Sequence, residues 1–397
     1  MIDRADVLRK LDERGLIELT RRLVRAPSVN PPGRYEEISG IMREEFEKLG
    51  LKVSIMEGEP GRPNVIGLLR GSEGNRTYMI SGHMDVVPEG DPSAWKYPPF
   101  GGEIHDGKIW GRGAADMKCA LAGEVYALRA VLDAGAELRG NLLLGATVDD
   151  EIAGPMGMKY VLEKGLRAAG FPRPDMVLIG EISDMDIVGS FKGRVWYRVK
   201  VRGRTAHGGA PQFGINAIEK AIALINEIKK MELRDHPLVG RDTINLGRME
   251  GGTKVNIVPE LCTFELDIRI GPPQSTQRVK EYVESAVRRM RAIDPELNVE
   301  ELAVTEDRDP LEVPEGHELV EIIKREVREV TGRAPAFKGS LSSGDLYYCI
   351  KSGIPGIWLG AGRLEVAHAP NEYVEIDKLV SASKVYALSI LDVCGQK

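Results

Sequence analysis

The chain lacks the features that mark membrane, exported and nucleic-acid-binding proteins. No stretch approaches the roughly 18 consecutive apolar residues that a membrane-spanning helix needs. The charged N-terminal segment, residues 1–15, is expected to form a helix rather than a secretion signal. The formal net charge of -6 gives no reason to expect nucleic acid as a partner. We therefore expect a cytoplasmic protein that binds neither membrane nor nucleic acid.

Cysteine is scarce, and the best-known cofactor motif is missing. The four cysteines lie far apart and form no C-x-x-C pair. This spacing indicates buried free thiols in a reducing compartment. The sequence also has no G-x-G-x-x-G segment that opens a helix after a strand, which argues against a Rossmann-type cofactor enzyme.

The chain does have length and a mixed composition. A chain of 397 residues is longer than a domain with a single hydrophobic core usually is, so we expect two domains. The first half alternates strand and helix patterns, which is typical of an α/β sheet that is largely parallel. The expected strands are residues 53–56, 64–69, 78–80, 141–148 and 176–179, and the expected helices are residues 16–24, 35–49, 117–134 and 156–164.

The pattern changes near residue 189. Residues 194–202 alternate charged and apolar side chains with a period of two, and the segments that follow read as helix, strand, strand, helix and strand. This β-α-β-β-α-β order is the ferredoxin-like arrangement. From about residue 310 the α/β pattern returns. We therefore predict a ferredoxin-like domain, residues 190–305, inserted into an α/β domain made of residues 1–189 and 306–397.

Acidic and imidazole side chains follow several of the expected strands or tight turns. They occur in the segments SGHMD, GRGAAD, TVDDE, IGE and AHAPNE, and the candidate metal ligands are His83, Asp116, Glu151, Glu181 and His368. In open α/β sheets, ligands bind beyond the carboxyl ends of the strands. Imidazole and carboxylate together suit zinc, cobalt or manganese. The pattern predicts two divalent metal ions, with zinc expected first and Asp116 as the bridge between them.

Two further acids have expected roles beside the metals. Asp150 adjoins a proposed ligand and is the candidate base that takes a proton from the attacking water and passes it to the leaving amine. Asp85 is expected to hydrogen-bond the ring nitrogen of His83 that the metal does not use. Asp149 is expected to be a capping or structural carboxylate.

These motifs, together with WKYPPFGGEIHDGKIWGRGAADMK, RTAHGGAP, GGTKVNIVPE and LDIRIGP, cover nearly the whole chain. They resemble the metallo-aminoacylase and exopeptidase family of acetylornithine deacetylase, succinyl-diaminopimelate desuccinylase, aminoacylase-1 and carboxypeptidase G. The resemblance implies a zinc-peptidase-like α/β domain with an inserted ferredoxin-like lid that also makes a homodimer.

The resemblance also assigns the ligands to the two metals. It implies that His83 and Glu181 bind one metal and that Glu151 and His368 bind the other. It places the base on Asp150, where the family usually has Glu, so the chain departs from its relatives by one methylene at this position. Such a difference in reach is on the scale that matters in catalysis.

Three residues of the predicted inserted domain also match family positions. His207 corresponds to a histidine that reaches the partner subunit's active site and steadies the oxyanion. Asn256 and Arg269 resemble positions that hold the substrate's α-carboxylate, for which the planar fork of Arg is suited. The segment SSGDLYYC, residues 342–349, resembles more loosely a part of the acyl pocket, with Tyr347 and Tyr348 either lining that pocket or packing in the core.

The leading hypothesis is therefore hydrolysis of the linear amide bond of an N-acyl amino acid by metal-activated water. One alternative is a metallo-dipeptidase or carboxypeptidase, which the same site could serve. A second is a non-catalytic, metal-dependent binding protein, for which Asp150 in the base position is the only support.

Overall fold

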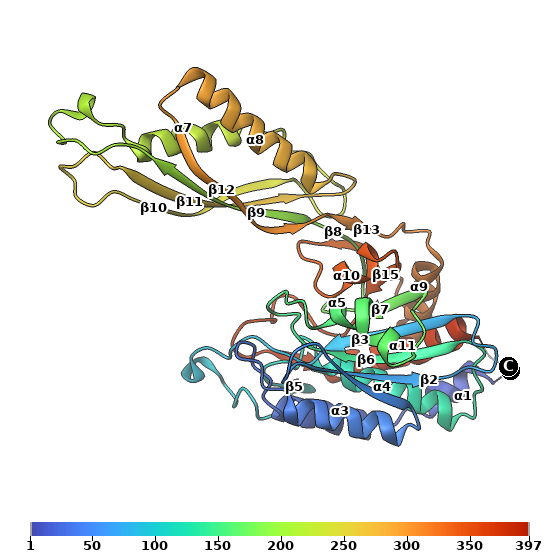
Figure 1. Ribbon diagram of the computed structural model, residues 1–397. Coiled ribbons are helices and arrows are strands. Elements are labelled where there is room, and N and C mark those ends of the chain that lie inside the picture. Colours follow the sequence, from blue (N-terminus) through green and yellow to red (C-terminus); the bar gives the residue numbers. More distant parts are fainter. Residues whose placement is uncertain (1, 396–397) are drawn as a thin grey trace. The chain divides into compact units, whose positions relative to one another are not determined.

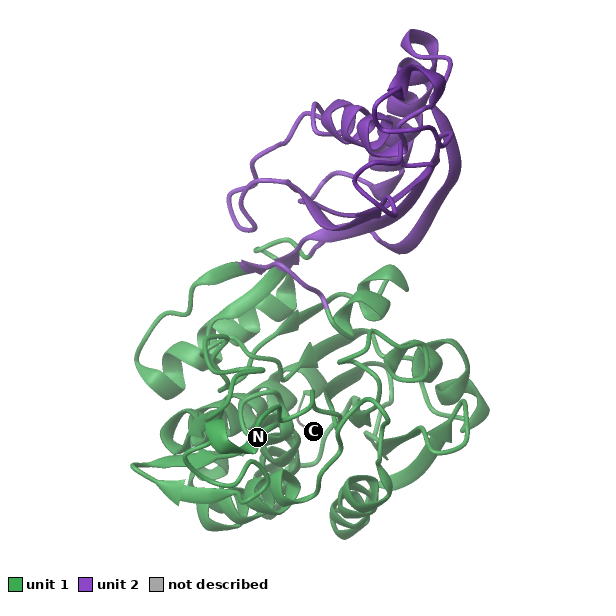
Figure 2. Cartoon of the chain, turned by 90° about the vertical axis from the view of Figure 1, so that its left-hand side faces the viewer, with its two compact units in different colours: residues 1–189, 313–338, 344–397 green, residues 190–312, 339–343 purple. Residues whose placement is uncertain are grey.

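The computed structural model describes residues 2–395, which divide into two compact units (Figure 2). Among the described residues, unit 1 comprises residues 2–189, 313–338 and 344–395, and unit 2 comprises residues 190–312 and 339–343. Residues 306–312 and 339–343 thus lie in unit 2, whereas the sequence analysis placed them in the larger domain. The strand that ends unit 2 continues to Arg308, and the carbonyl oxygen of Leu341 accepts a hydrogen bond from Arg269.

The larger sheet has nine strands, in the order β1-β2-β6-β3-β7-β15-β8-β13, with β14 paired to β8. The pairs β6–β3, β3–β7 and β7–β15 are parallel, and the flanking pairs toward either edge are antiparallel. The strands are β1 (Lys52–Glu57), β2 (Pro63–Leu69), β3 (Thr77–His83), β6 (Asn141–Thr147), β7 (Met176–Ile179), β8 (Ile187–Phe191), β13 (Leu311–Glu312), β14 (Phe337–Ser340) and β15 (Gly356–Trp358).

The sequence of the central strands explains their position. Every residue of β3, β6 and β7 is buried, and β6 reads NLLLGAT with no alternation of polar and apolar side chains. Such continuous apolar runs are typical of strands covered on both faces. Because these three strands are parallel neighbours, their carboxyl ends lie at one edge of the sheet.

Helices cover the sheet of unit 1 (Figure 1), and α4 and α11 pack closely against each other. They are α1 (Arg4–Arg9), α2 (Glu13–Arg25), α3 (Glu36–Lys48), α4 (Lys118–Asp133), α5 (Met158–Tyr160), α6 (Leu166–Ala168), α9 (Glu318–Thr331), α10 (Leu346–Lys351) and α11 (Ile376–Cys394). A π-helical turn, η2 (Val161–Gly165), joins α5 to α6, and a short helix, η1 (Pro92–Ala94), precedes a small three-stranded sheet. The order of that sheet is β16-β5-β4, with bounds Tyr373–Glu375, Lys108–Trp110 and Glu103–His105.

Unit 2 has its own antiparallel sheet, in the order β10-β11-β9-β12, with α7 and α8 against it (Figure 1). Its elements are β9 (Gly193–Arg202), η3 (Pro211–Phe213), α7 (Ala217–Ile228), β10 (Thr243–Gly251), β11 (Leu261–Ile270), α8 (Thr276–Ile293) and β12 (Asn298–Arg308). Alternate residues of β11 are buried, so one face of the sheet packs against the helices. The β-α-β-β-α-β order is the predicted one.

The predicted fold class is thus confirmed: a mostly parallel central sheet with a ferredoxin-like insertion. The prediction missed β4, β5, β8, β13, β14, β16 and α10, which are all short. No helix among residues 2–395 combines the length and apolar character that a membrane span requires.

Candidate metal centre

The carboxyl edge of the larger sheet brings the predicted ligands together. His83 is the last residue of β3, Glu151 follows β6 by four residues, and Glu181 follows β7 by two. Asp116 precedes α4, and His368 lies in the turn between β15 and β16. The parallel strands therefore place three of the five side chains at one edge, and two loops supply the others.

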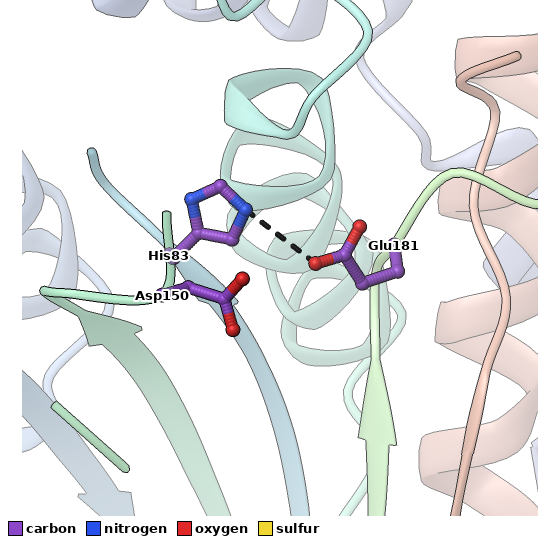
Figure 3. A group of neighbouring side chains, drawn as sticks. All are labelled: His83, Asp150 and Glu181. Carbon is purple, nitrogen blue, oxygen red and sulfur yellow. Dashed lines mark ion pairs between the residues drawn. The ribbon is translucent and has the colours of Figure 1, made fainter. Parts of the chain in front are cut away.

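Asp116 lies at the middle of this set. Its Oδ1 atom is 3.2 Å from Nε2 of His83, and its Oδ2 atom is 3.2 Å from Nε2 of His368. Nε2 of His83 is also 3.4 Å from Oε1 of Glu181 (Figure 3). Nε2 of His368 is 3.1 Å from Oε2 of Glu151. The five predicted ligands thus form a continuous series of contacts, with one oxygen of Asp116 directed to each histidine.

Burial and charge shift the pKa values of this group strongly. Burial, and then the Asp116 carboxylate, raise the pKa of Glu181 to about 7. Burial opposes ionisation of Asp116 too, but the two histidines lower its pKa below the usual value. Hydrogen bonds to Asp116 and Glu151 raise the pKa of His368 to about 10. The carboxylates of this centre therefore concentrate negative charge. Bound protons must balance that charge when no metal ion is present.

The donor set fits divalent metal ions. Ligand atoms of His83, Asp150 and Glu181 lie within 4.8 Å of one another, as do those of His83, Asp116 and Glu151. Oε1 of Glu151 and Oδ1 of Asp150 are buried without a hydrogen-bond partner within residues 2–395. Two imidazoles with several carboxylates suit zinc, cobalt or manganese better than magnesium or calcium.

Asp150 lies directly beside the proposed ligands (Figure 3). It follows β6 by three residues, and its carboxylate belongs to the close group with His83 and Glu181. A carboxylate at this position can accept a proton from a water held between the ligands, or it can contact a metal itself. The structure thus places Asp150 beside two of the candidate ligands, and its role as the base stays a prediction.

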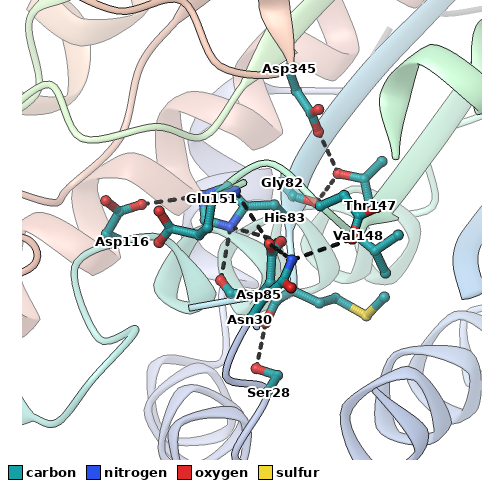
Figure 4. Close-up of polar contacts among 12 residues, drawn as sticks. Ser28, Asn30, Gly82, His83, Asp85, Asp116, Thr147, Val148, Glu151 and Asp345 are labelled. Atoms are coloured by element: carbon teal, nitrogen blue, oxygen red, sulfur yellow. Dashed lines mark hydrogen bonds and ion pairs between the residues drawn. The ribbon is translucent and has the colours of Figure 1, made fainter. Parts of the chain in front are cut away.

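Asp85 contacts His83 differently from the prediction. Nδ1 of His83 lies 2.9 Å from the backbone carbonyl oxygen of Asp85 and 3.6 Å from its carboxylate. The carboxylate instead accepts hydrogen bonds from Asn30 Nδ2 at 3.0 Å and from the backbone N–H of Glu151 at 3.2 Å (Figure 4). Asp85 therefore holds the ring through its main chain and the Glu151 backbone through its side chain.

A second carboxylate fixes the turn that carries Asp150. Asp149 is buried and has a positive φ of 67°, which is uncommon for a residue with a side chain. Its Oδ1 atom accepts hydrogen bonds from Asn30, Tyr35 and Arg62. The expected structural role of Asp149 agrees with these contacts, but the sequence offered no signal for its three partners, which lie more than 80 residues away.

Asp345, in the segment SSGDLYYC, is another site residue that the sequence analysis did not single out. Thr147 Oγ1 lies 2.6 Å from Asp345 Oδ2 and 3.1 Å from the carbonyl oxygen of Gly82 (Figure 4). One hydroxyl proton cannot serve both acceptors, so a protonated Asp345 satisfies all three groups. Burial, and then the Asp150 carboxylate, raise the pKa of Asp345 well above its usual value. In the same segment, the Tyr348 hydroxyl donates to the carbonyl oxygen of Ala153.

The other three predicted residues lie in unit 2. His207 is exposed, and its Nδ1 atom accepts the N–H of Gly209 at 3.0 Å, which leaves Nε2 to carry the ring proton. The carbonyl oxygen of Asn256 accepts the N–H of Gly208, so His207 and Asn256 are neighbours. Arg269 is half-buried and pairs with Asp267 at 2.8 Å on its own strand.

Comparison with known proteins identifies relatives over nearly the whole chain. The model of peptidase family M20/M25/M40 matches residues 79–392. An N-formyl-4-amino-5-aminomethyl-2-methylpyrimidine deformylase of Halalkalibacterium halodurans is 28% identical, over 96% of this chain and 94% of the relative. The deformylase of the same name from Bacillus subtilis is 29% identical, over 96% and 95%.

Solved structures match the fold. The aminopeptidase PepT from Bacillus cereus has a TM-score of 0.79 at 24% identity, and covers 97% of this chain and 99% of its own. An M20 family metallo-carboxypeptidase from Sulfolobus solfataricus has a TM-score of 0.76 at 22% identity, with 96% and 99% covered. A dinuclear metal-binding M20 peptidase from Bacillus subtilis has a TM-score of 0.72 at 17% identity, with 98% and 99% covered.

Metal binding should release protons from this centre. Because the pKa of His368 is about 10 without metal, its ring is protonated at neutral pH, and a cation that binds Nε2 must displace that proton. We expect the apparent metal affinity to rise with pH until the pKa of His368 is passed. Calorimetric titration with zinc in buffers of different ionisation enthalpy measures the protons released, and His368→Ala should release fewer. A binding enthalpy that is independent of the buffer would contradict this expectation.

Proposed function

We propose that this chain, which belongs to peptidase family M20/M25/M40, hydrolyses the linear amide bond of small N-acylated compounds with two bound divalent metal ions. Membership of this family makes the chain a hydrolase. The amide specificity, the metals and the roles of individual residues are our proposal. N-acyl amino acids are the substrate class we favour, with zinc as the first candidate metal and cobalt or manganese as alternatives.

The observation that carries the proposal is the position of Asp116. One carboxylate oxygen of Asp116 lies 3.2 Å from Nε2 of His83, and the other lies 3.2 Å from Nε2 of His368. At Nε2, each of these histidines contacts one further carboxylate. This symmetry supports two metal positions that share Asp116, one with His83 and Glu181 and the other with Glu151 and His368. Metal ions bound there would polarise the scissile carbonyl and lower the pKa of a water between them.

Asp150 moves the proton in this scheme. It accepts a proton from the attacking water as the new C–O bond forms, and it donates that proton to the leaving nitrogen as the C–N bond breaks. Its place beside His83 and Glu181 supports this role and argues against a purely binding function on the same fold. Asp85 and Asp149 hold the segment on which Asp150 lies.

The acyl group we propose is small. The two curated relatives are named for removal of a formyl group from an aminomethylpyrimidine amine, which is also cleavage of a linear amide. We therefore include N-formyl amines beside N-acetyl and N-succinyl amino acids. The four cysteines are all buried and free, which supports the proposed cytoplasmic location.

A substrate panel tests the proposed activity. Purified protein loaded with zinc, cobalt or manganese should cleave N-formyl or N-acyl substrates faster than dipeptides, and release of free amine measures the rate. Preference for dipeptides would favour the peptidase alternative. Bound metal without any turnover would favour a binding protein.

Substitutions at Asp150 separate its role as a base from its role in metal binding. Asp150→Asn keeps the size but cannot accept the proton, so kcat should fall by about 10²–10⁴-fold while metal content stays the same. Asp150→Glu keeps the carboxylate and extends its reach by one methylene, and we expect activity within about tenfold of the native chain. A large gain in rate for Asp150→Glu would show instead that the short side chain limits turnover.

His207 is proposed to donate from Nε2 to the oxyanion in the active site of a partner subunit. Loss of one such donor costs about 10²–10³-fold in kcat, so His207→Ala should lose this much with its metal content unchanged. Mixing His207→Ala with Asp150→Asn should restore activity, because each hetero-dimer regains one complete site. If the mixture stays inactive while hetero-dimers form, His207 does not act across subunits.

A further inference from the structure

We infer that Arg112 and Glu372 form a buried positioning pair that sets the distance between Asp116 and His368, and through it the affinity of one metal position. The inference rests on the proposed two-metal centre. Neither residue has a predicted role as ligand, base or substrate contact. Both lie in motifs that supply a ligand, Arg112 four residues before Asp116 and Glu372 four residues after His368.

Glu372 holds the loop that carries Asp116. It is fully buried, and its Oε1 atom accepts the backbone N–H groups of Ala115 at 2.9 Å and of Asp116 at 3.1 Å. Two hydrogen bonds to one charged oxygen are stronger than neutral ones. The backbone at Asp116 is therefore fixed to the segment that contains His368.

Arg112 holds the loop that carries His368. It is 2% exposed, and its Nη1 atom lies 2.5 Å from Oε2 of Glu372. The same guanidinium donates to the carbonyl oxygens of Ala369 and His368, each at 3.3 Å, and the ring of Trp95 lies 5.2 Å away. A planar fork that serves a carboxylate and two carbonyl oxygens at once is a geometry that Arg offers and Lys does not.

The backbone at His368 requires such support. His368 has a positive φ of 61°, and Asn371 in the same turn has a φ of 65°. A residue with a side chain adopts this conformation only when its surroundings determine it. The side chain of His368 is 54% exposed, so packing does little to fix it. The hydrogen bonds from Arg112 are thus a main restraint on the backbone that carries this side chain.

The two proposed metal positions differ in what holds their histidine in place. His83 is the last residue of β3 and its ring nitrogen contacts the carbonyl oxygen of Asp85, so the sheet holds it in place. Arg112 contacts the main chain at His368 but makes no hydrogen bond to His83 or Glu181 within residues 2–395. If Glu372 still accepts the N–H groups of Ala115 and Asp116, loss of the Arg112 contacts should therefore affect the metal between Glu151 and His368 and spare the other.

The test uses Arg112→Lys, which keeps the positive charge beside Glu372 but loses the fork. Competitive titration with cobalt and a chelator gives both metal-binding constants. Residues that orient metal ligands typically contribute 10–100-fold to metal affinity, so one constant should weaken by about this factor while the other stays within about threefold. Arg21→Lys is the matched control, because Arg21 also donates to a backbone carbonyl, that of Gly102, in the same unit.

A second variant keeps the test decisive if Arg112→Lys does not fold. The double substitution Arg112→Met with Glu372→Gln removes both charges and leaves no unpaired buried ion. It should also weaken the binding of one metal ion, while its circular dichroism spectrum stays the same as that of the native chain. Two unchanged constants in a folded variant would overturn the inference. If the native chain itself binds no more than one metal, the proposed two-metal centre fails instead, and the two failures are distinguishable.

Discussion

Repulsion among buried carboxylates is the constraint that shapes this structure. Because β6, β3 and β7 run parallel, the acidic residues that follow them meet at one edge, where burial strengthens every charge interaction. Asp116, Glu151 and Glu181 share that edge with Asp150. Such a group is stable only if protons, metal ions or fixed cations balance it. The rest of the site follows from which carboxylate receives which kind of partner.

The partners divide the acids into two kinds. Asp149 and Glu372 each have a fixed guanidinium, from Arg62 and Arg112, and these acids hold loops in place. Glu151 and Asp150 have no such cation, and each keeps a buried oxygen without a hydrogen-bond partner within the described part of the chain. Among these four acids, the two that lack a fixed guanidinium are the candidates for metal binding and proton transfer.

The sequence indicated the candidate ligands but not the residues that support them, for a physical reason. A ligand follows a strand, and a buried strand is readable as an apolar run, so His83 and Glu181 could be located from local pattern. A support is a pair contact between distant segments. Arg62 contacts Asp149 across 87 residues of sequence and Arg112 contacts Glu372 across 260, and nothing in either local sequence marks the pairing. The short strands β8, β13 and β14 escaped prediction similarly, because two to five residues carry too little periodicity.

The short side chain at Asp150 fits the space around it. A Cβ atom added at Gly344 would lie 2.8 Å from Oδ1 of Asp150, so the main chain there approaches the carboxylate closely. Gly344 also has a φ of 44°, a conformation that favours glycine. A longer acid at position 150 would have to turn away from this backbone or push it aside. The shorter side chain of Asp150 still places its carboxylate close to His83 and Glu181. The position of the backbone at Asp150, and not the length of the side chain alone, therefore determines where the carboxylate lies.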